Sequence, residues 1–135
     1  MLPAAFASVC LATSVHGNIV RAGAFSGAIL RRYDVLNDRF RLHVGPYRDA
    51  RRQLSQKIAW SVSPRARVDN ELVVKWRLLH AQGRSFEDIL QLAGTSNANR
   101  FFPSSFSPPV AGCWRLTFKS GSLHGALTVV VTDRH

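Results

Sequence analysis

The last third of the chain carries the pattern that most restricts its fold, an alternation of apolar and polar residues over two successive segments. Every second residue from Trp114 to Phe118 is apolar, and after the turn around Gly121 the alternation resumes and continues to Thr132. A period of two is typical of a strand with one buried and one solvent-exposed face. The two prolines at 108–109 cannot donate the backbone hydrogen bonds of a sheet interior. We therefore predict a closing antiparallel hairpin that begins after these prolines.

Shorter segments with the same period lie upstream, separated by Gly, Pro and Asn residues that favour turns. Each places its apolar side chains on one face, and each is rich in residues that favour strands. We predict strands in four such segments: residues 39–44, 56–62, 72–79 and 101–106.

The segment that follows Ser85 is ambiguous. Ser85 could cap a short helix with Phe86 and Ile89 on its buried face. A strand would instead place Asp88 and Leu90 on one face. The sequence slightly favours the irregular or short helical connection.

Several short strands with little helix predict an all-β protein, and we expect an immunoglobulin-like antiparallel β-sandwich. A length of 135 residues supports a single domain with a substantial core. We assign this domain to residues 39–135, preceded by a linker or arm at 18–38, where periodicity is weak. The tryptophans fall on the apolar faces of predicted strands, which favours core packing over a carbohydrate-stacking platform. They are Trp60, Trp76 and Trp114.

Residues 1–17 are apolar and small, and no charge occurs before Arg21. This composition is similar to the apolar centre of a secretory signal, although the basic start of such signals is missing. We therefore expect a signal-like or loosely ordered amino terminus and a secreted or envelope location. A structural amino-terminal segment in a cytoplasmic protein is the alternative. No apolar run reaches the roughly 20 residues that span a bilayer as a helix.

The formal net charge of +10 suggests an anionic partner, but the basic residues are spread along the chain without a compact run. A solvated Arg-rich surface is the simplest interpretation. Alternation predicts two outward basic strand faces, one with Arg39, Arg41 and His43 and one with Arg115 and Lys119. These are our candidate contacts for an anionic envelope polymer or lipid head groups. Nucleic acid is less favoured, because the aromatic residues that could stack on bases are predicted to point inward.

The two cysteines, Cys10 and Cys113, leave two alternatives open. They can form a disulfide if the amino terminus is retained in an oxidising compartment, whereas signal cleavage would leave Cys113 unpaired. Cys113 and His124 could also be cross-strand neighbours on one sheet face, which is the arrangement that a cysteine nucleophile would need. A cysteine on a partly covered sheet is more often structural, and we expect no catalytic pair.

Neither a metal site nor a cofactor site is expected. The histidines are isolated, no C-x-x-C occurs, and the sequence lacks a Gly-rich phosphate loop and a G-x-S-x-G element.

Four motifs carry a resemblance to a known group of proteins. They are Val44-Gly45-Pro46, then Gln56-Lys57-Ile58-Ala59-Trp60, then Glu71-Leu72-Val73-Val74 followed by Arg77-Leu78-Leu79, and finally Pro109-Val110-Ala111-Gly112-Cys113-Trp114-Arg115-Leu116-Thr117. Together they resemble a family of small bacterial secreted or envelope proteins without assigned activity, over residues 39–132. In this family a Gly-Cys-Trp triplet opens the penultimate strand. The resemblance implies an exported β-sandwich and transfers no catalytic residue. We therefore expect a secreted, non-catalytic binding or structural module. The alternative is a basic nucleic-acid-binding module in the cytosol.

Overall fold

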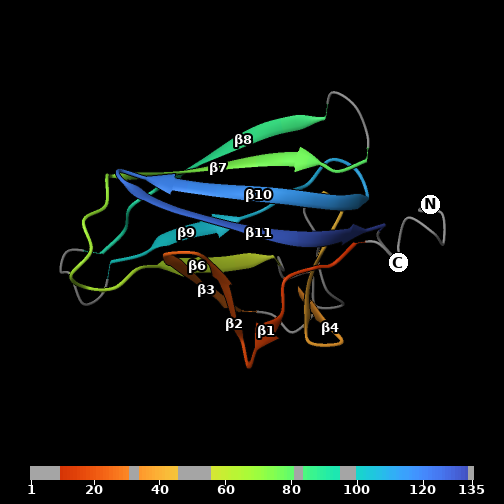
Figure 1. Ribbon diagram of the computed structural model, residues 1–135, viewed down its shortest axis with the longest axis horizontal. Coiled ribbons are helices and arrows are strands. Elements are labelled where there is room, and N and C mark those ends of the chain that lie inside the picture. Colours follow the sequence, from red (N-terminus) through yellow and green to blue (C-terminus); the bar gives the residue numbers. More distant parts are fainter. Residues whose placement is uncertain (1–9, 31–33, 46–55, 81–83, 95–99, 134–135) are drawn as a thin grey trace.

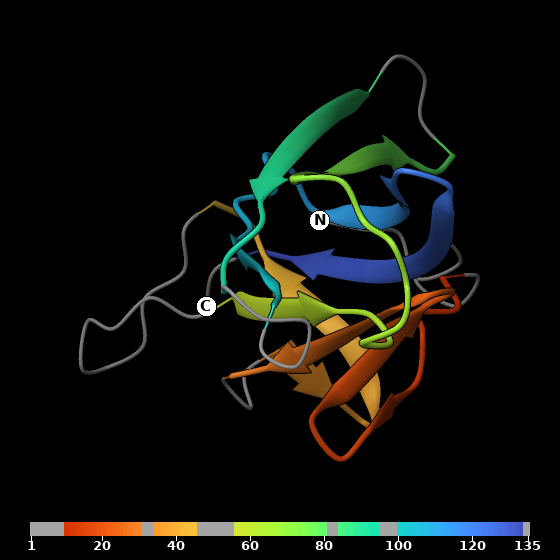
Figure 2. The same cartoon turned by 90° about the vertical axis from the view of Figure 1, so that its left-hand side faces the viewer.

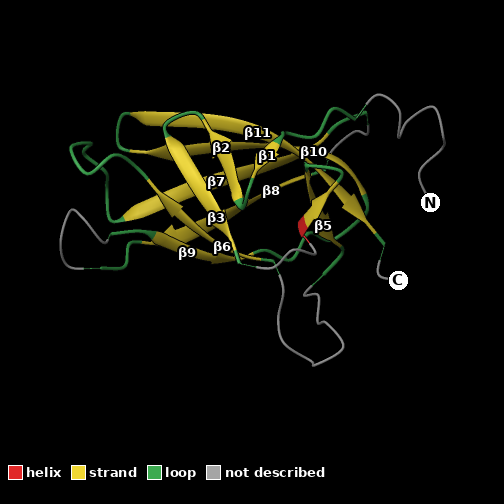
Figure 3. Cartoon of the chain, turned by 90° about the horizontal axis from the view of Figure 1, so that it is seen from below, coloured by secondary structure: helices red, strands yellow, loops and turns green. Residues whose placement is uncertain are grey.

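Two β-sheets packed face to face make up the computed structural model of the protein (Figures 1 and 2). It describes residues 10–30, 34–45, 56–80, 84–94 and 100–133. Strands account for the regular structure of these residues, apart from one helical position at Asp34 (Figure 3). In the same residues no helix is long and apolar enough to cross a membrane. The predicted all-β sandwich is thus confirmed, and its immunoglobulin-like character stays a prediction.

The first sheet has five strands in the order β1-β2-β3-β6-β9, and all neighbours pair antiparallel. Its strands are β1 (Val15–His16), β2 (Ile19–Ala22), β3 (Phe25–Ile29), β6 (Lys57–Ser61) and β9 (Phe102–Ser105).

The second sheet has six strands in the order β4-β5-β11-β10-β7-β8. Its neighbours are antiparallel except for the parallel pair of β5 and β11. Its strands are β4 (Val35–Leu36), β5 (Arg39–His43), β7 (Glu71–Leu78), β8 (Ser85–Gln91), β10 (Gly112–Ser120) and β11 (Leu123–Thr132).

The predicted closing hairpin is confirmed as β10 and β11, whose register pairs Trp114 with Val129 and Ser120 with Leu123. Along β10 the residues from Trp114 to Lys119 alternate strictly between buried and exposed. The other four predicted strands are also found, as β5, β6, β7 and β9. Alternation was therefore sufficient to predict these strands.

The core between the sheets is built around aromatic rings. Trp60 and Trp114 are 0% exposed and Trp76 is 1% exposed. The ring of Trp60 lies 4.6 Å from that of Phe118 on the opposite sheet, and Trp76 and Trp114 meet edge to face at 5.9 Å. Each buried indole N–H donates a hydrogen bond, so that no tryptophan is held by packing alone. The acceptors are Ser104 Oγ for Trp60, Asp88 Oδ2 for Trp76 and the Val110 carbonyl for Trp114.

The expected linker or arm at 18–38 is not what the structure shows for the residues described there. They form β2, β3 and β4, and Val20, Ala22 and Phe25 are fully buried. The sequence signal is weak because the strands are short and because Gly27 occupies an inward position of β3. A Cβ atom at Gly27 would lie 2.6 Å from the Trp60 ring, which shows that the indole packs directly on the glycine backbone.

The favoured helical or irregular connection after Ser85 is wrong, because residues 85–91 form strand β8. Phe86 stacks on Trp76, its partner on β7, with ring centroids 5.0 Å apart and an interplanar angle of 16°. Ile89, which a helix would have buried, is 54% exposed. Pairing with β7 and the stacking of Phe86 thus outweigh the weak local helical pattern.

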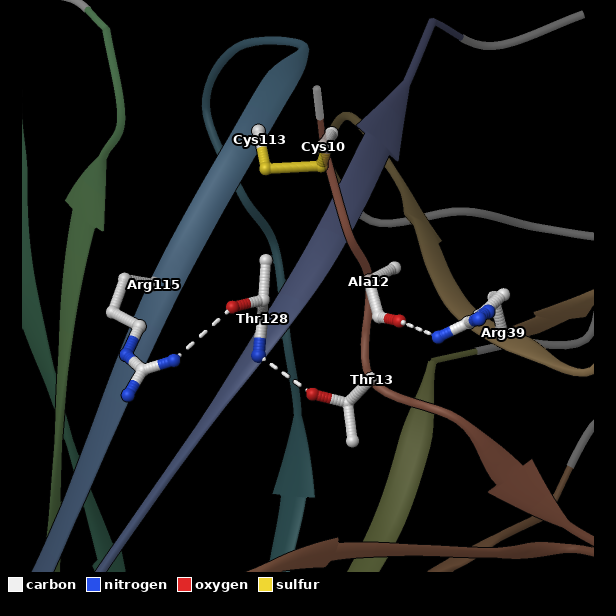
Figure 4. The surroundings of a disulfide bond; sticks show 7 residues. All are labelled: Cys10, Ala12, Thr13, Arg39, Cys113, Arg115 and Thr128. Atoms are coloured by element: carbon white, nitrogen blue, oxygen red, sulfur yellow. Dashed lines mark hydrogen bonds between the residues drawn. A yellow bond between two sulfur atoms is a disulfide. The ribbon is translucent and has the colours of Figure 1, made fainter. Parts of the chain in front are cut away.

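The N-terminal strap, residues 10–14, is fastened to the second sheet (Figure 4). Cys10 forms a disulfide with Cys113 at the start of β10. Further along, the Thr13 N–H donates to the Thr128 carbonyl, and Thr13 Oγ1 accepts from the Thr128 N–H. Residues 10–17 were included in the expected signal-like segment, but they belong to the folded sandwich.

Among the contacts that connect the sheets beyond the shared core in the described residues, we single out two as joints. At the first, the backbone of Gly125 on β11 lies directly against β2: a Cβ atom there would be 1.7 Å from the Ala22 carbonyl oxygen. At the second, buried Gln56 donates through Nε2 to the Gly45 and Phe106 carbonyls and accepts from the His43 N–H. The buried Asp34 carboxylate accepts from the Gln56 N–H at 3.0 Å.

Candidate anion-binding face

The outward side of the second sheet carries four cations on two neighbouring strands, β7 and β10. Because side chains alternate along a strand, the exposed positions of β7 include Lys75 and Arg77, and those of β10 include Arg115 and Lys119. We call these four residues and the surface between them the basic face.

Arg77 and Arg115 are directly opposite each other in the antiparallel register of β7 and β10. Such partners have Cβ atoms about 5 Å apart, and like charges in this position destabilise a sheet. Neither guanidinium has a carboxylate partner among the described residues. On the side away from Arg77, Arg115 donates from Nη1 to Thr128 Oγ1 of β11 at 3.3 Å (Figure 4). This hydrogen bond orients the Arg115 guanidinium. The pair is therefore a site where two positive charges meet without an ion pair among the described residues.

The next row across the sheet holds the carboxylate of this region, Glu87 on β8. It lies opposite Lys75, and the two form an ion pair with Nζ and Oε2 3.8 Å apart. Both side chains are at least half exposed, so that water and salt screen this pair strongly. Lys75 is also opposite the hydroxyl of Thr117 on β10. One of the four cations is thus weakly compensated.

The third row contains Lys119, whose partners are Val73 on β7 and His124 on β11. It lies at the hairpin end of β10, four residues from Arg115. No carboxylate pairs with Lys119 among the described residues.

Two hollows open onto the basic face and share Lys75, Glu87 and Thr117 in their walls. One, of about 470 Å³, contains Arg77 and Arg115; the other, of about 560 Å³, contains Lys119 and His124. We call the two together the groove. A third hollow of about 720 Å³ adjoins the groove at Lys119 and is lined by the carboxylates of Asp69 and Glu71. The positive surface therefore ends at Lys119.

The four basic residues singled out in the sequence do not form one surface. Arg115 and Lys119 lie on the basic face, but Arg39 donates to the Ala12 carbonyl at 2.9 Å on the far side of the N-terminal strap (Figure 4). Arg41, on the same strand as Arg39, is half-buried and acts electrostatically on Asp34. His43, the other residue of this strand that alternation places outward, is buried. Strand β11 and the strap thus lie between Arg39 and the groove.

The sequence analysis did not place Lys75 and Arg77 on the same surface as Arg115 and Lys119. Their outward positions on β7 follow from alternation, but their neighbours do not. The pairing of β7 with β10 is a contact between strands more than thirty residues apart, and local periodicity says nothing about register at that distance.

The hypothesis that Cys113 and His124 are cross-strand neighbours is wrong. Cys113 pairs with Val130 at one end of the hairpin, whereas His124 pairs with Lys119 at the other. Cys113 is also joined to Cys10, the only other cysteine of the chain, so that neither carries a free thiol. The geometry that a cysteine nucleophile would need does not exist here.

Two carboxyl groups on the inner side of the structure have raised pKa values. Burial raises the pKa of Asp34 to about 7, although the hydrogen bond from the Gln56 N–H and the charge of Arg41 oppose the shift. Burial also raises the pKa of Asp88, partly offset by the hydrogen bond from Trp76. Both serve inner contacts rather than the groove, and within the described residues no group of three or more His, Cys, Asp and Glu side chains could hold a metal ion.

Comparisons with protein-family models, with curated proteins and with solved structures found no match. The chemistry of the face must therefore be derived from its residues. Exposed guanidinium and ammonium groups without carboxylate partners bind anions, and they offer neither a nucleophile nor an acid–base pair.

Proposed function

We propose that the protein is an exported, non-catalytic binding module that attaches to an anionic polymer through the basic face. The observation that carries this proposal is the direct opposition of Arg77 and Arg115 without a carboxylate partner among the described residues. Two like charges at adjacent positions destabilise the free protein slightly, and a bound anion would turn this repulsion into attraction.

A polymer is favoured over a lipid surface by the composition of the face. Large apolar side chains that are exposed in the described residues are Leu11, Leu30, Leu36 and Ile89. Of these only Ile89 belongs to the outward side of β8 beside the groove. Proteins that rest on bilayers combine cations with an apolar surface that enters the acyl boundary. A single isoleucine does not provide one.

The cytosolic nucleic-acid alternative finds less support. Binding of single strands uses exposed aromatic rings on which bases stack. The tryptophans of β7 and β10, Trp76 and Trp114, point to the core, and the outward positions of these strands hold no aromatic residue. Attraction to a nucleic acid would thus be electrostatic and independent of sequence.

Export is supported by the disulfide between Cys10 and Cys113, because such bonds persist in oxidising compartments. It also agrees with the resemblance to secreted and envelope proteins. Cleavage near Gly17 would remove Cys10 and β1, so we propose that a cleaved leader would end before Cys10. Intact mass and free-thiol content of the protein recovered from fractionated cells test this proposal. A cytoplasmic protein with two free thiols would contradict it.

The binding function is tested by attachment to immobilised polyphosphate at increasing salt concentration. We expect binding at low ionic strength and its loss by about 0.5 M salt, where the screening length falls to a few ångströms. Vesicles of an anionic phospholipid serve as the parallel arm. Attachment that survives 0.5 M salt would contradict an electrostatic face, and tighter binding to vesicles than to polyphosphate would contradict the polymer.

A further inference from the structure

The groove has a direction, because its charges follow the strands. Its two hollows succeed each other along β7 and β10, with Arg77 and Arg115 at one end and Lys119 at the other. Four residues of a strand separate Arg115 from Lys119, a distance of about 13 Å. A small anion can occupy one end, and only an extended ligand can occupy both.

The arginine end has a geometry that favours phosphate over carboxylate. A planar carboxylate matches the fork of one guanidinium, whereas the tetrahedral oxygens of a phosphoryl group can accept from two guanidinium groups at once. The same row of the sheet adds the hydroxyl groups of Ser85 beside Arg77 and Thr128 beside Arg115. Thr128 already holds the Arg115 guanidinium, which reduces the entropy lost when an anion binds.

The far end of the groove limits the ligand. Lys119 is opposite His124, which supplies a ring nitrogen for a second contact. Beyond Lys119 the walls of the adjoining hollow hold Asp69 and Glu71. Their negative charges repel an anionic chain, so a bound chain would leave the surface at this point.

We propose that the groove binds a linear phosphate-bearing chain along β7 and β10, with one phosphoryl group between Arg77 and Arg115 and a later one at Lys119 and His124. This inference rests on the proposed function and deepens it by naming the class of ligand and the two contact points. Between them, Lys75 exchanges its weak ion pair with Glu87 for a phosphate in the middle of the chain.

The test is calorimetric titration of the whole folded protein with inorganic polyphosphates of increasing length, beginning with pyrophosphate. We expect affinity to rise steeply once a chain spans both ends, because the second contact then becomes intramolecular. The double variant R77Q/R115Q removes one end and K119Q removes the other. The control, K57Q/R65Q, removes two exposed cations outside the groove and leaves the same net charge as R77Q/R115Q.

Each variant has its own expected result. R77Q/R115Q weakens binding of long chains at least tenfold, removes the length threshold and makes the salt dependence shallower by about 1.5 in log–log slope. K119Q weakens binding of long chains and leaves pyrophosphate binding unchanged. The control changes affinity less than about twofold at 0.15 M salt, where distant charges are screened.

Failures of the two proposals are distinguishable. If every groove variant weakens all chain lengths equally while the control binds normally, the spanning groove is wrong and the basic face stands. An equal loss in the control would contradict the basic face itself. Polyglutamate that binds as tightly as polyphosphate of equal charge would overturn the assignment to phosphate. Single-stranded DNA of matched charge tests whether the phosphates come from a nucleic acid. A preference for DNA over polyphosphate would contradict the proposal that the groove recognises the chain by its phosphates alone.

Discussion

The two sheets bury their inner faces in the same way and present different outer faces. The outward positions of β3, β6 and β9 are mostly small and neutral, as at Ser26, Ala59 and Ser105, with Lys57 as an isolated cation. On the second sheet the corresponding positions of β7 and β10 hold four cations in adjacent rows. The difference shows that the position of a charge matters more here than the total of +10, since four of the 18 Lys and Arg residues lie together on one outer face.

The largest effect is expected from a substitution at the first joint, where Gly125 of the second sheet contacts Ala22 of the first. This contact holds the two sheets together, with their outer faces on opposite sides of the core. Gly125→Ala places a Cβ atom 1.7 Å from the Ala22 carbonyl oxygen, and backbone on both sides leaves little room to relax. We expect the free energy of unfolding to fall by more than about 4 kcal/mol, measured by urea denaturation. The control is Gly17→Ala, where no atom lies within 4 Å and only the positive φ of 64° opposes the substitution, at about 1 kcal/mol. Equal losses in the two variants would disprove the close contact.

The second effect concerns the N-terminal strap, which is fastened to the second sheet by a disulfide. The disulfide between Cys10 and Cys113 joins residues 103 positions apart. Its removal in C10S/C113S should lower the free energy of unfolding by about 3 kcal/mol, chiefly because the unfolded chain regains entropy. Denaturation of the wild type with and without reductant gives the same comparison. Unchanged stability under both treatments would mean that the hydrogen bonds of the strap, such as those of Thr13 with Thr128 and of Ala12 with Arg39, hold it without the disulfide.

Stability should also depend on pH through Asp34, at the second joint between the sheets. Its folded pKa of about 7 lies above the ordinary unfolded value near 3.9, so the folded state retains a proton that the unfolded state loses. The stabilisation is therefore complete below about pH 4 and is lost as the pH rises through 7. We expect the free energy of unfolding to fall by roughly 2 kcal/mol across this window. This is less than the full pKa shift would give, since water that enters around the ionised carboxylate lowers the free-energy cost of its charge.

Asp34→Asn isolates this contribution from the other titrating groups. An asparagine can still accept the Gln56 N–H and carries no charge at any pH. The stability of the variant relative to the wild type should rise between pH 4 and pH 8. A constant difference over that range would show that Asp34 ionises normally.

The sequence predicted strands where the alternation of apolar and polar residues is clear. It failed where the strand is short or where the same residues also fit a helix. β7 and β10 could be read from alternation, and their inward residues Trp76 and Trp114 are in the core. β2 and β3 were missed, since a strand of four or five residues with Gly27 at an inward position carries too few apolar residues to show a period. β8 was misjudged because the contact that decides it, Phe86 on Trp76, joins separate strands.

Part of the candidate site could be predicted from the sequence: which side chains face outward, but not which of them are neighbours. Alternation indicates that Arg115 and Lys119 face outward, as the structure shows. It cannot indicate that Arg77 lies opposite Arg115, because a register is set by packing and turn geometry over the whole sheet. Nor could it reveal that the N-terminal strap would engage Arg39 and separate it from this surface.

The smallest effect on stability is expected from Glu87→Gln, a substitution that also tests whether the outer face of the second sheet is the binding surface. Glu87 is the carboxylate within the groove, and its ion pair with Lys75 is exposed, so Glu87→Gln should change the free energy of unfolding by less than about 0.5 kcal/mol. Removal of its charge should nevertheless raise affinity for long polyphosphate by up to about fivefold at low salt, since one exposed charge at contact distance is worth about 1 kcal/mol. The control is Asp133→Asn, which makes the same change in net charge at an exposed position outside the groove walls. If both variants raise affinity equally, the protein binds polyanions through its overall charge; if only Glu87→Gln does, the outer face of the second sheet is where binding occurs.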